Sequence, residues 1–236
     1  MTKEGKLPGK KNRKTHNLGN SQNDPSPDYR SIPLEKLAAG SWSVSWKRGI
    51  YSYKLKERFG LNVPENIIKI ENLEIGNVGL ITVRKAAPRD QTNVTSDDNE
   101  FRVSKNDLVI ATYGPPFKCA VVDEWVDGCL LSENLVALSL NDTVPPAYVA
   151  AYLNSIWGQK EFDKNLTPYK DSRYSRITEH NLKLLEIPLP PNKAAPSVYQ
   201  WFENLFQYEV TLHWERELHG RIAQAIFQRI GGGVSP

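Results

Sequence analysis

Residues 169–176 bring cations, aromatic rings and hydroxyl groups together in one short stretch. Lysine and arginine side chains neutralise phosphates, and guanidinium and hydroxyl groups reach the edges of bases. We therefore expect Lys170, Arg173, Tyr174 and Arg176 to contact nucleic acid from an exposed loop. A solvated loop whose charges have no ligand is the alternative, and the residue types alone leave both open.

A second candidate is the turn formed by residues 112–118, in which Gly114 is followed by two prolines. Proline fixes the backbone φ angle, and glycine permits tight geometry, so the turn should be stiff and well shaped. Such a turn can present Tyr113 and Lys118 to a ligand with little loss of conformational entropy. A purely structural turn is the alternative.

The chain carries no recognisable catalytic set. The string Pro145–Tyr148 lacks the order, and the polar first residue, of the pocket used by DNA amino-methyltransferases. Asp28 is never followed by the Glu-x-Lys that a metal-dependent nuclease needs. His213 and His219 are six positions apart on a predicted helix, so they cannot share a zinc ion in the i, i+4 arrangement. We expect a binding protein that is not an enzyme and has no cofactor or metal ion.

Composition supports a packed core, since 39% of the 236 residues are hydrophobic and 24% are charged. No apolar run approaches the roughly 18 residues of a membrane-spanning helix, and no secretory signal follows Met1. Cys119 and Cys129 are the only cysteines, too few for a disulfide framework. These features predict a cytoplasmic protein with no membrane partner.

The charge is unevenly placed along the chain, whose net charge is +3. Residues 1–29 contain few large aliphatic side chains, and their composition predicts a flexible basic arm. Glu4 is the single acidic residue among the first twenty, which hold these cations: Lys3, Lys6, Lys10, Lys11, Arg13 and Lys14. The arm either contacts phosphates or only solubilises the chain, so affinity in the folded part must come from local clusters.

Short apolar segments separated by turns predict a mixed α+β fold. The expected strands are residues 41–46, 67–73, 78–84, 108–111, 119–122 and 134–140. Helical spacing of apolar residues predicts a helix over 148–162 and a short helix capped by Thr178. Pro188, Pro190 and Pro191 are expected to end regular structure.

The last segment predicts one long helix, about 50 Å in length, between Ser197 and the glycines at 231–233. Ser197 and Gln200 match a capping box. Steps of three and four residues define a coiled-coil seam, interrupted by Glu215 and His219, with these partner-facing positions: Trp201, Leu205, Tyr208, Leu212, Ile222 and Ile226.

Other apolar side chains lie off this seam and are expected to clasp the globular body: Phe202, Phe206, Trp214, Leu218 and Phe227. Because the helix is too long to be covered by its own domain, part of the seam should meet another helix. A long core helix folded wholly against its own sheet is the alternative.

Several short motifs follow one another in a defined order. They are Ile67–Leu73, Val78–Ile81, Val103–Ile110, Thr112–Gly114, Cys119–Val122, Leu131–Leu135, Tyr152–Ser155 with Gly158–Gln159, and Ile187–Pro191, followed by the long helix. This order resembles the target recognition domain of the specificity (S) subunit of type I restriction–modification enzymes, over roughly residues 31–230. Two features depart from that family: a single domain and helix with no internal repeat, and Asn192-Lys193 where Glu-Gln is often found.

The resemblance implies that the domain reads one half of a split sequence in double-stranded DNA. It also implies that the helices pair to hold two such domains at a set separation. Methylation and cleavage belong to partners, an adenine-specific DNA methyltransferase subunit and a restriction–translocation subunit. A half-length chain is expected to restore the two-domain arrangement as a homodimer or by pairing with another S-type helix.

Together these observations predict three parts: a flexible basic arm (1–29), a target recognition domain with a mixed sheet and short helices (30–192), and a long dimerisation or partner helix with a Gly-rich tail (193–236). The expected function is that of a non-catalytic, sequence-specific DNA-recognition subunit in a type I-like restriction–modification or related phage-defence system. A scaffold or protein-interaction module with the same fold and no sequence-specific DNA reading is the alternative.

Overall fold

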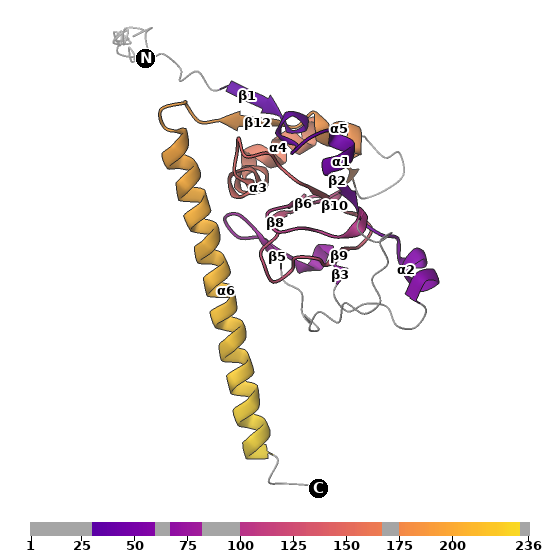
Figure 1. The fold of residues 1–236 in the computed structure, drawn as a ribbon, viewed down its shortest axis with the longest axis vertical. Helices are drawn as coiled ribbons and strands as arrows, with labels where there is room; N and C mark the ends of the chain where they lie inside the picture. Colours follow the sequence, from indigo (N-terminus) through magenta and orange to yellow (C-terminus); the bar gives the residue numbers. More distant parts are fainter. Residues whose placement is uncertain (1–29, 60–66, 82–99, 167–174, 232–236) are drawn as a thin grey trace, which may run out of the picture.

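The structure is a computed structural model that describes residues 30–59, 67–81, 100–166 and 175–231. The predicted basic arm and the candidate DNA-contacting residues Lys170, Arg173 and Tyr174 lie outside these ranges. The described chain forms a body of mixed strands and short helices, and one long C-terminal helix runs along its side (Figure 1). The predicted α+β fold class with a long terminal helix is confirmed.

A six-stranded mixed sheet forms the centre of the body. Neighbouring strands are antiparallel except β5 and β8, which run parallel. In sheet order the strands are β2 (Trp46–Arg48), β10 (Leu135–Leu138), β6 (Leu108–Ala111), β8 (Cys119–Val121), β5 (Leu80–Ile81) and β4 (Leu73–Glu74). The predicted strands at 108–111, 119–122 and 134–140 are therefore present. The expectation of one strand over 67–73 is wrong, because a short 3-10 helix, Ile70–Asn72, separates Ile67–Ile68 from Leu73–Glu74.

The central strands are buried on both faces of the sheet. Leu108 and Ile110 of β6 belong to one apolar cluster, whereas Val109 and Ala111 belong to another on the opposite face. This explains why β6 is a continuous apolar run without alternation. Figure 1 shows α3 (Pro146–Asn154) and α4 (Ile156–Lys164) on one side of the sheet, and β3 (Ile67–Ile68) with β9 (Leu130–Leu131) on the other.

The predicted helix over 148–162 is divided into α3 (Pro146–Asn154) and α4 (Ile156–Lys164). Ser155 separates them with an extended backbone, and its Oγ accepts a hydrogen bond from the N–H of Gly158 at 3.2 Å. A Cβ at Gly158 would lie 2.2 Å from the carbonyl oxygen of Tyr152, so only glycine fits this close approach.

The expectation that residues 41–46 form a strand is wrong. Residues Trp42–Ser45 form the short helix α1, and only Trp46 begins the strand β2. The alternating pattern misled because tryptophans four positions apart also lie on one side of a helical turn. The Trp42 and Trp46 rings stack with their centroids 5.1 Å apart, and Val44 is 79% exposed.

Pro188 does not end regular structure as expected, whereas the strand that contains it does end at Leu189, directly before Pro190 and Pro191. β12 (Glu186–Leu189) contains Pro188 and pairs with β1 (Arg30–Pro33), the first described strand. A two-stranded ribbon tolerates proline because one edge of each strand needs no donor. The short helix α5 (Glu179–Lys183) is capped by Thr178 as predicted, with Thr178 Oγ1 accepting from the Asn181 N–H at 3.3 Å.

The long helix α6 (Ala195–Gly231) has 37 residues and a length of about 55 Å. It begins at Ala195, so the predicted capping box at Ser197 is wrong; Pro196 occupies the first turn, where a missing N–H does no harm. Gln200, the other predicted box residue, donates from Nε2 to Asn204 Oδ1 at 3.0 Å. In Figure 1 the C-terminal end of α6 extends beyond the body.

Candidate nucleic-acid interface and partner helix

The two segments that the sequence suggested for DNA contact meet in a short ribbon. Strand β7 (Tyr113–Gly114) pairs antiparallel with β11 (Ser175–Arg176), so Tyr113 lies opposite Arg176 and Gly114 opposite Ser175. Arg176 is exposed and Tyr113 is half-buried. Directly opposed residues of an antiparallel pair project from the same face, so these two side chains share one surface.

Backbone hydrogen bonds fix this ribbon to the body. The N–H of Ile177 donates to the carbonyl of Thr112 at 3.1 Å. The Thr112 N–H donates to the carbonyl of Asn134 at 2.8 Å, and Thr112 Oγ1 donates to the same oxygen at 3.1 Å. Asn134 belongs to the turn between β9 and β10, residues 132–134. The ribbon is therefore tied to the body by hydrogen bonds through the buried residue Thr112.

Two side-chain amides hold the turn that follows β7. Gln159 Oε1 accepts from the Phe117 N–H at 3.0 Å, and its Nε2 donates to the Phe117 carbonyl at 2.8 Å. Asn154 binds Cys119 in the same way: its Oδ1 accepts from the Cys119 N–H at 2.9 Å, and its Nδ2 donates to the Cys119 carbonyl at 2.8 Å. These clamps mimic a strand neighbour and set the position of the turn. Sequence reasoning noticed Asn154 and Gln159 in a motif but assigned them no role.

Lys118 has a different environment from Tyr113. Its Nζ donates to the carbonyl of Leu73 in β4 at 3.2 Å, and the side chain is half-buried. Phe117 beside it is fully buried and stacks on Phe162 at a centroid distance of 4.8 Å. Lys118 therefore anchors the turn to the sheet edge in this structure, and its contact with DNA stays a prediction.

The first half of α6 packs on the body. Phe206 is buried in the main apolar cluster, with Phe202, Leu205 and Val210 packed against it. The Tyr148 ring meets the Phe202 ring edge-on at 5.3 Å. Phe202 and Phe206 thus clasp the body as predicted, whereas Leu205, assigned to the partner seam, is half-buried against the same cluster.

Glu209 ties α6 to the connection between β4 and β5. Its Oε1 accepts from the backbone N–H groups of Asn77 at 2.6 Å and Val78 at 3.4 Å. A Cβ on Gly76 would stand 2.8 Å from the same oxygen, so the absence of a side chain there lets the carboxylate approach. Sequence reasoning did not identify this contact, because an acidic residue on a helix gives no sign of a distant backbone partner.

Trp214 makes the last contact between α6 and the body. Its ring lies 4.3 Å from that of Trp125, centroid to centroid, as the predicted clasp requires. Nearby, Asp123 is buried and its Oδ1 accepts from the N–H groups of Trp125 and Val126 at 2.8 and 3.1 Å. Burial raises the pKa of the Asp123 carboxyl, and these two hydrogen bonds act in the opposite direction.

Beyond Trp214 the helix leaves the body. The prediction that Leu218 and Phe227 clasp the body is wrong, because these side chains are 56% and 72% exposed. The seam residues Ile222 and Ile226 are 49% and 50% exposed, so the alternative of a helix folded wholly against its own sheet is wrong as well. Every side chain described from Glu215 to Ile230 is exposed.

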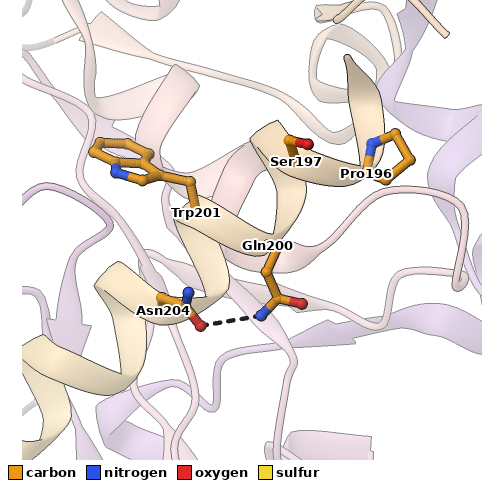
Figure 2. Close-up of a pocket in the computed structure, with 5 residues that line it drawn as sticks. All are labelled: Pro196, Ser197, Gln200, Trp201 and Asn204. Carbon is orange, nitrogen blue, oxygen red and sulfur yellow. Dashed lines mark hydrogen bonds between the residues drawn. The ribbon is translucent and has the colours of Figure 1, made fainter. Parts of the chain in front are cut away.

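A shallow hollow marks the beginning of α6 (Figure 2). All of its lining residues come from this one helix: Pro196, Ser197, Gln200, Trp201 and Asn204. Trp201, 58% exposed, and Tyr208, 59% exposed, are seam residues on this part of the helix, and Leu212 is half-buried. The hollow holds no titratable group, so it is better suited to packing against another surface than to chemistry.

Within the described ranges, no three His, Cys, Asp or Glu side chains are grouped so that they could hold a metal ion. Burial raises the pKa of the Cys119 thiol, which keeps it in its unreactive neutral form. Among the helices of these same ranges, none has the length and apolar character needed to cross a bilayer.

No protein-family model and no curated protein matches the chain. The solved structures with a similar fold include a chain of a structure titled for complex assembly and conformational transition of the type I R-M system. They also include the HsdS subunit from Thermoanaerobacter tengcongensis and the type I restriction-modification S subunit from M. genitalium. The identities are 17%, 18% and 18%, and the TM-scores are 0.40, 0.40 and 0.42.

These matches cover 90%, 89% and 89% of this chain but only 47%, 46% and 47% of the solved chains. This chain therefore spans about half the length of the structures that it matches. Two of the three are named as S subunits, the family that the sequence motifs resemble.

Proposed function

We propose that this chain is a non-catalytic, sequence-specific DNA-recognition subunit of a type I-like restriction–modification or related phage-defence system. The β7–β11 ribbon is the observation that carries the proposal. Residues chosen separately from the sequence, Tyr113 and Arg176, are directly opposite each other in this ribbon. The ordered motifs that resemble the S-subunit family supply the class of ligand, duplex DNA.

The ribbon has suitable chemistry for reading a base. A two-stranded β-ribbon fits the major groove, and an arginine fork pairs with the O6 and N7 atoms of guanine. Arg176 supplies the fork, and the Tyr113 hydroxyl can donate to a phosphate or a base acceptor. Lys170, Arg173 and Tyr174, which the sequence adds just before β11, are proposed to extend the same contact.

The free half of α6 is proposed to pair with the same helix of a second copy. Its exposed apolar side chains recur at intervals of four: Leu218, Ile222, Ile226 and Ile230. Exposed stripes of this kind mark interaction surfaces. Glu215 and His219, polar positions in the seam, would fix the register of the pair. Two chains joined in this way would hold two recognition domains at a set separation, as the resemblance implies.

The partners are proposed to be an adenine-specific DNA methyltransferase subunit and a restriction–translocation subunit, which would perform the chemistry. The support for them is the resemblance together with the absence of a recognisable catalytic motif in the sequence. In this assignment the chain recognises the DNA sequence, and its paired helices bind the partner enzymes.

Selection from a random duplex library tests the proposal directly. The full chain, with and without the candidate methyltransferase, should enrich one sequence motif. The variant Arg176→Ala should lose enrichment at one base position, whereas Lys36→Ala, which removes an exposed lysine outside the ribbon, should not. Failure of the wild-type chain to enrich any motif under either condition would refute sequence recognition.

A further inference from the structure

A surface patch next to the ribbon combines aromatic rings and cations that the sequence analysis did not single out. Tyr51 and Tyr53 are 48% and 63% exposed, and their rings stack with centroids 5.7 Å apart. Tyr53 lies on the helix α2 (Ser52–Phe59), and Lys54 and Lys56 are exposed on the same helix. We call these four residues the tyrosine–lysine patch.

A buried leucine of α2 anchors the patch to the body. Leu55 of α2 is buried, and it packs with Ile50, Ile67 and Leu130 in a small apolar cluster. The N–H of Leu55 donates to the Tyr51 carbonyl at 3.0 Å. Because Leu55 faces inward, the residues on either side of it, Lys54 and Lys56, turn outward.

The lysines of the patch differ from the cations that precede them. Lys47 forms an ion pair with Asp107 at 2.7 Å, and Arg48 pairs with Glu179 at 2.8 Å. Lys54 and Lys56 have no ion pair or hydrogen bond among the interactions of the described residues. Their charges are therefore available to a ligand.

Two acidic residues next to the patch balance the formal charge of its two lysines, so the patch offers hydrogen-bond donors rather than a net positive charge. Glu57 follows Lys56 on α2, and the carboxylate of Glu133 accepts a hydrogen bond from Ser52 Oγ at 2.8 Å. Glu133 is half-buried beneath the start of the helix. The exposed lysine ammonium groups and tyrosine hydroxyls are donors of the kind that bind phosphate oxygens.

The turn at residues 132–134 connects the patch to the ribbon. On one side, Ser52 bonds to Glu133 and the Ile50 N–H donates to the Leu131 carbonyl at 2.8 Å. On the other side, Thr112, next to Tyr113, bonds to the carbonyl of Asn134. The patch and the ribbon therefore flank one turn and can engage a single extended ligand.

We propose that the tyrosine–lysine patch is a second DNA-contacting site, which grips the phosphate backbone of the duplex whose bases the ribbon reads. This inference rests on the proposed function and assigns the patch a sequence-independent part of the binding. Lysine suits this role because it acts as a point charge on phosphate without selecting a base.

A salt titration of the double variant Lys54→Ala/Lys56→Ala tests the assignment. Binding to the selected duplex and to a random duplex is measured by fluorescence anisotropy over a range of salt concentrations. Loss of two phosphate contacts should reduce the slope of log K against log[salt] by about 1.8 and weaken both duplexes by about tenfold or more near 0.1 M salt. The matched control is Lys36→Ala/Lys193→Ala, which removes two exposed lysines elsewhere and should leave the slope unchanged.

The second variant, Tyr51→Phe/Tyr53→Phe, keeps the stacked rings and removes the two hydroxyls, and it should weaken both duplexes by a few-fold. The proposal is overturned if the lysine variant behaves like its control, if only the selected duplex is weakened, if only single-stranded DNA binding is lost, or if a protein partner is lost while DNA binding persists. The outcomes also separate the two proposals. If the lysine variant has a reduced salt slope but the wild type enriches no motif, the patch is supported and sequence reading is refuted. If the wild type enriches a motif but the lysine variant has an unchanged slope, sequence reading is supported and the patch is refuted.

Discussion

Arg176 lies directly opposite Tyr113 across the antiparallel ribbon formed by β7 and β11, although the two residues come from distant parts of the sequence. If the arginine reads a guanine, Arg176→Ala should lose about 1–3 kcal/mol of binding free energy on the preferred sequence. The preference at one base position should relax at the same time. Binding measured against a panel of single-base variants of the motif would show this. Equal weakening on every sequence would instead assign Arg176 to a phosphate.

The Gln159 clamp should contribute to stability as well as to the position of the turn. In Gln159→Ala the N–H and carbonyl of the buried residue Phe117 lose their partners, which should lower the free energy of unfolding by about 1–3 kcal/mol. Gln200→Ala, which removes an exposed amide bonded to Asn204, should change it by less than about 0.5 kcal/mol. Denaturant unfolding of both variants tests the difference, and equal effects would contradict the clamp.

Gly49 fixes the path of the chain that leads to α2. A Cβ there would stand 1.8 Å from the Ser132 carbonyl oxygen, a backbone atom that cannot move aside. Gly49→Ala should therefore destabilise the protein by about 1–3 kcal/mol or more. Gly220→Ala, where the added Cβ meets nothing within 4 Å on an exposed helix, should stabilise it by about 0.5–1 kcal/mol. Thermal melts of the two variants should shift in opposite directions, and a Gly49→Ala protein as stable as the wild type would contradict the close approach.

The buried carboxyl of Asp123 should make stability depend on pH. Its pKa is raised from 3.8 chiefly by burial, so the folded state binds the proton more tightly than the unfolded state. Stability therefore falls as the pH rises through the interval between the unfolded and the folded pKa, and it is constant above that interval.

Asp123→Asn removes this dependence and keeps an oxygen that can accept from the N–H groups of Trp125 and Val126. The variant should gain stability relative to the wild type as the pH is raised from about 3 towards neutrality. Denaturant unfolding at a series of pH values measures the gap between the free energies of unfolding of the variant and the wild type. A gap that grows on acidification would show that the folded state stabilises the carboxylate, which is the opposite of the expected result.

Pairing through the free half of α6 predicts a dimer whose strength depends on the apolar stripe. Ile222→Asp/Ile226→Asp should shift the protein to a monomer without changing the unfolding of the body, because both side chains are exposed in the single chain. Gln224→Asp/Gln228→Asp adds the same charge on another face of the helix and should leave the dimer intact. Light-scattering mass measurements over a concentration series provide the test, and a wild-type monomer at every concentration would refute self-pairing.

Sequence patterns identified the elements whose burial follows the chain's own periodicity. β6 and β10 are uninterrupted apolar runs because both of their faces are covered, and Thr178 caps α5 with its own hydroxyl. The strand prediction for residues 41–46 was wrong because a spacing of four residues, as between Trp42 and Trp46, fits both the two-residue period of a strand and one turn of a helix. Neighbouring residues alone cannot separate these two structures.

The candidate site was only partly accessible from the sequence. Residue types pointed to Tyr113 and Arg176, but two-residue strands carry no pattern, and their pairing is set by Thr112 and the distant carbonyl of Asn134. The periodicity of α6 showed which face is apolar but not where the body ends, so Leu218 and Phe227 were misplaced. Glu209 bonds to a loop far along the chain, and no local pattern records such a contact.

The attachment of α6 at Glu209 and Trp214 makes the free half of the helix a lever arm. About 24 Å of helix lies beyond Trp214, so a tilt of only about 10° at that attachment would move the tip at Ile230 by about 4 Å. A displacement of that size is close to one helical turn or one base-pair step. A small change in the tilt of α6 at the Trp125–Trp214 contact would therefore produce a larger change in the distance between the body and a partner bound at the tip of the helix.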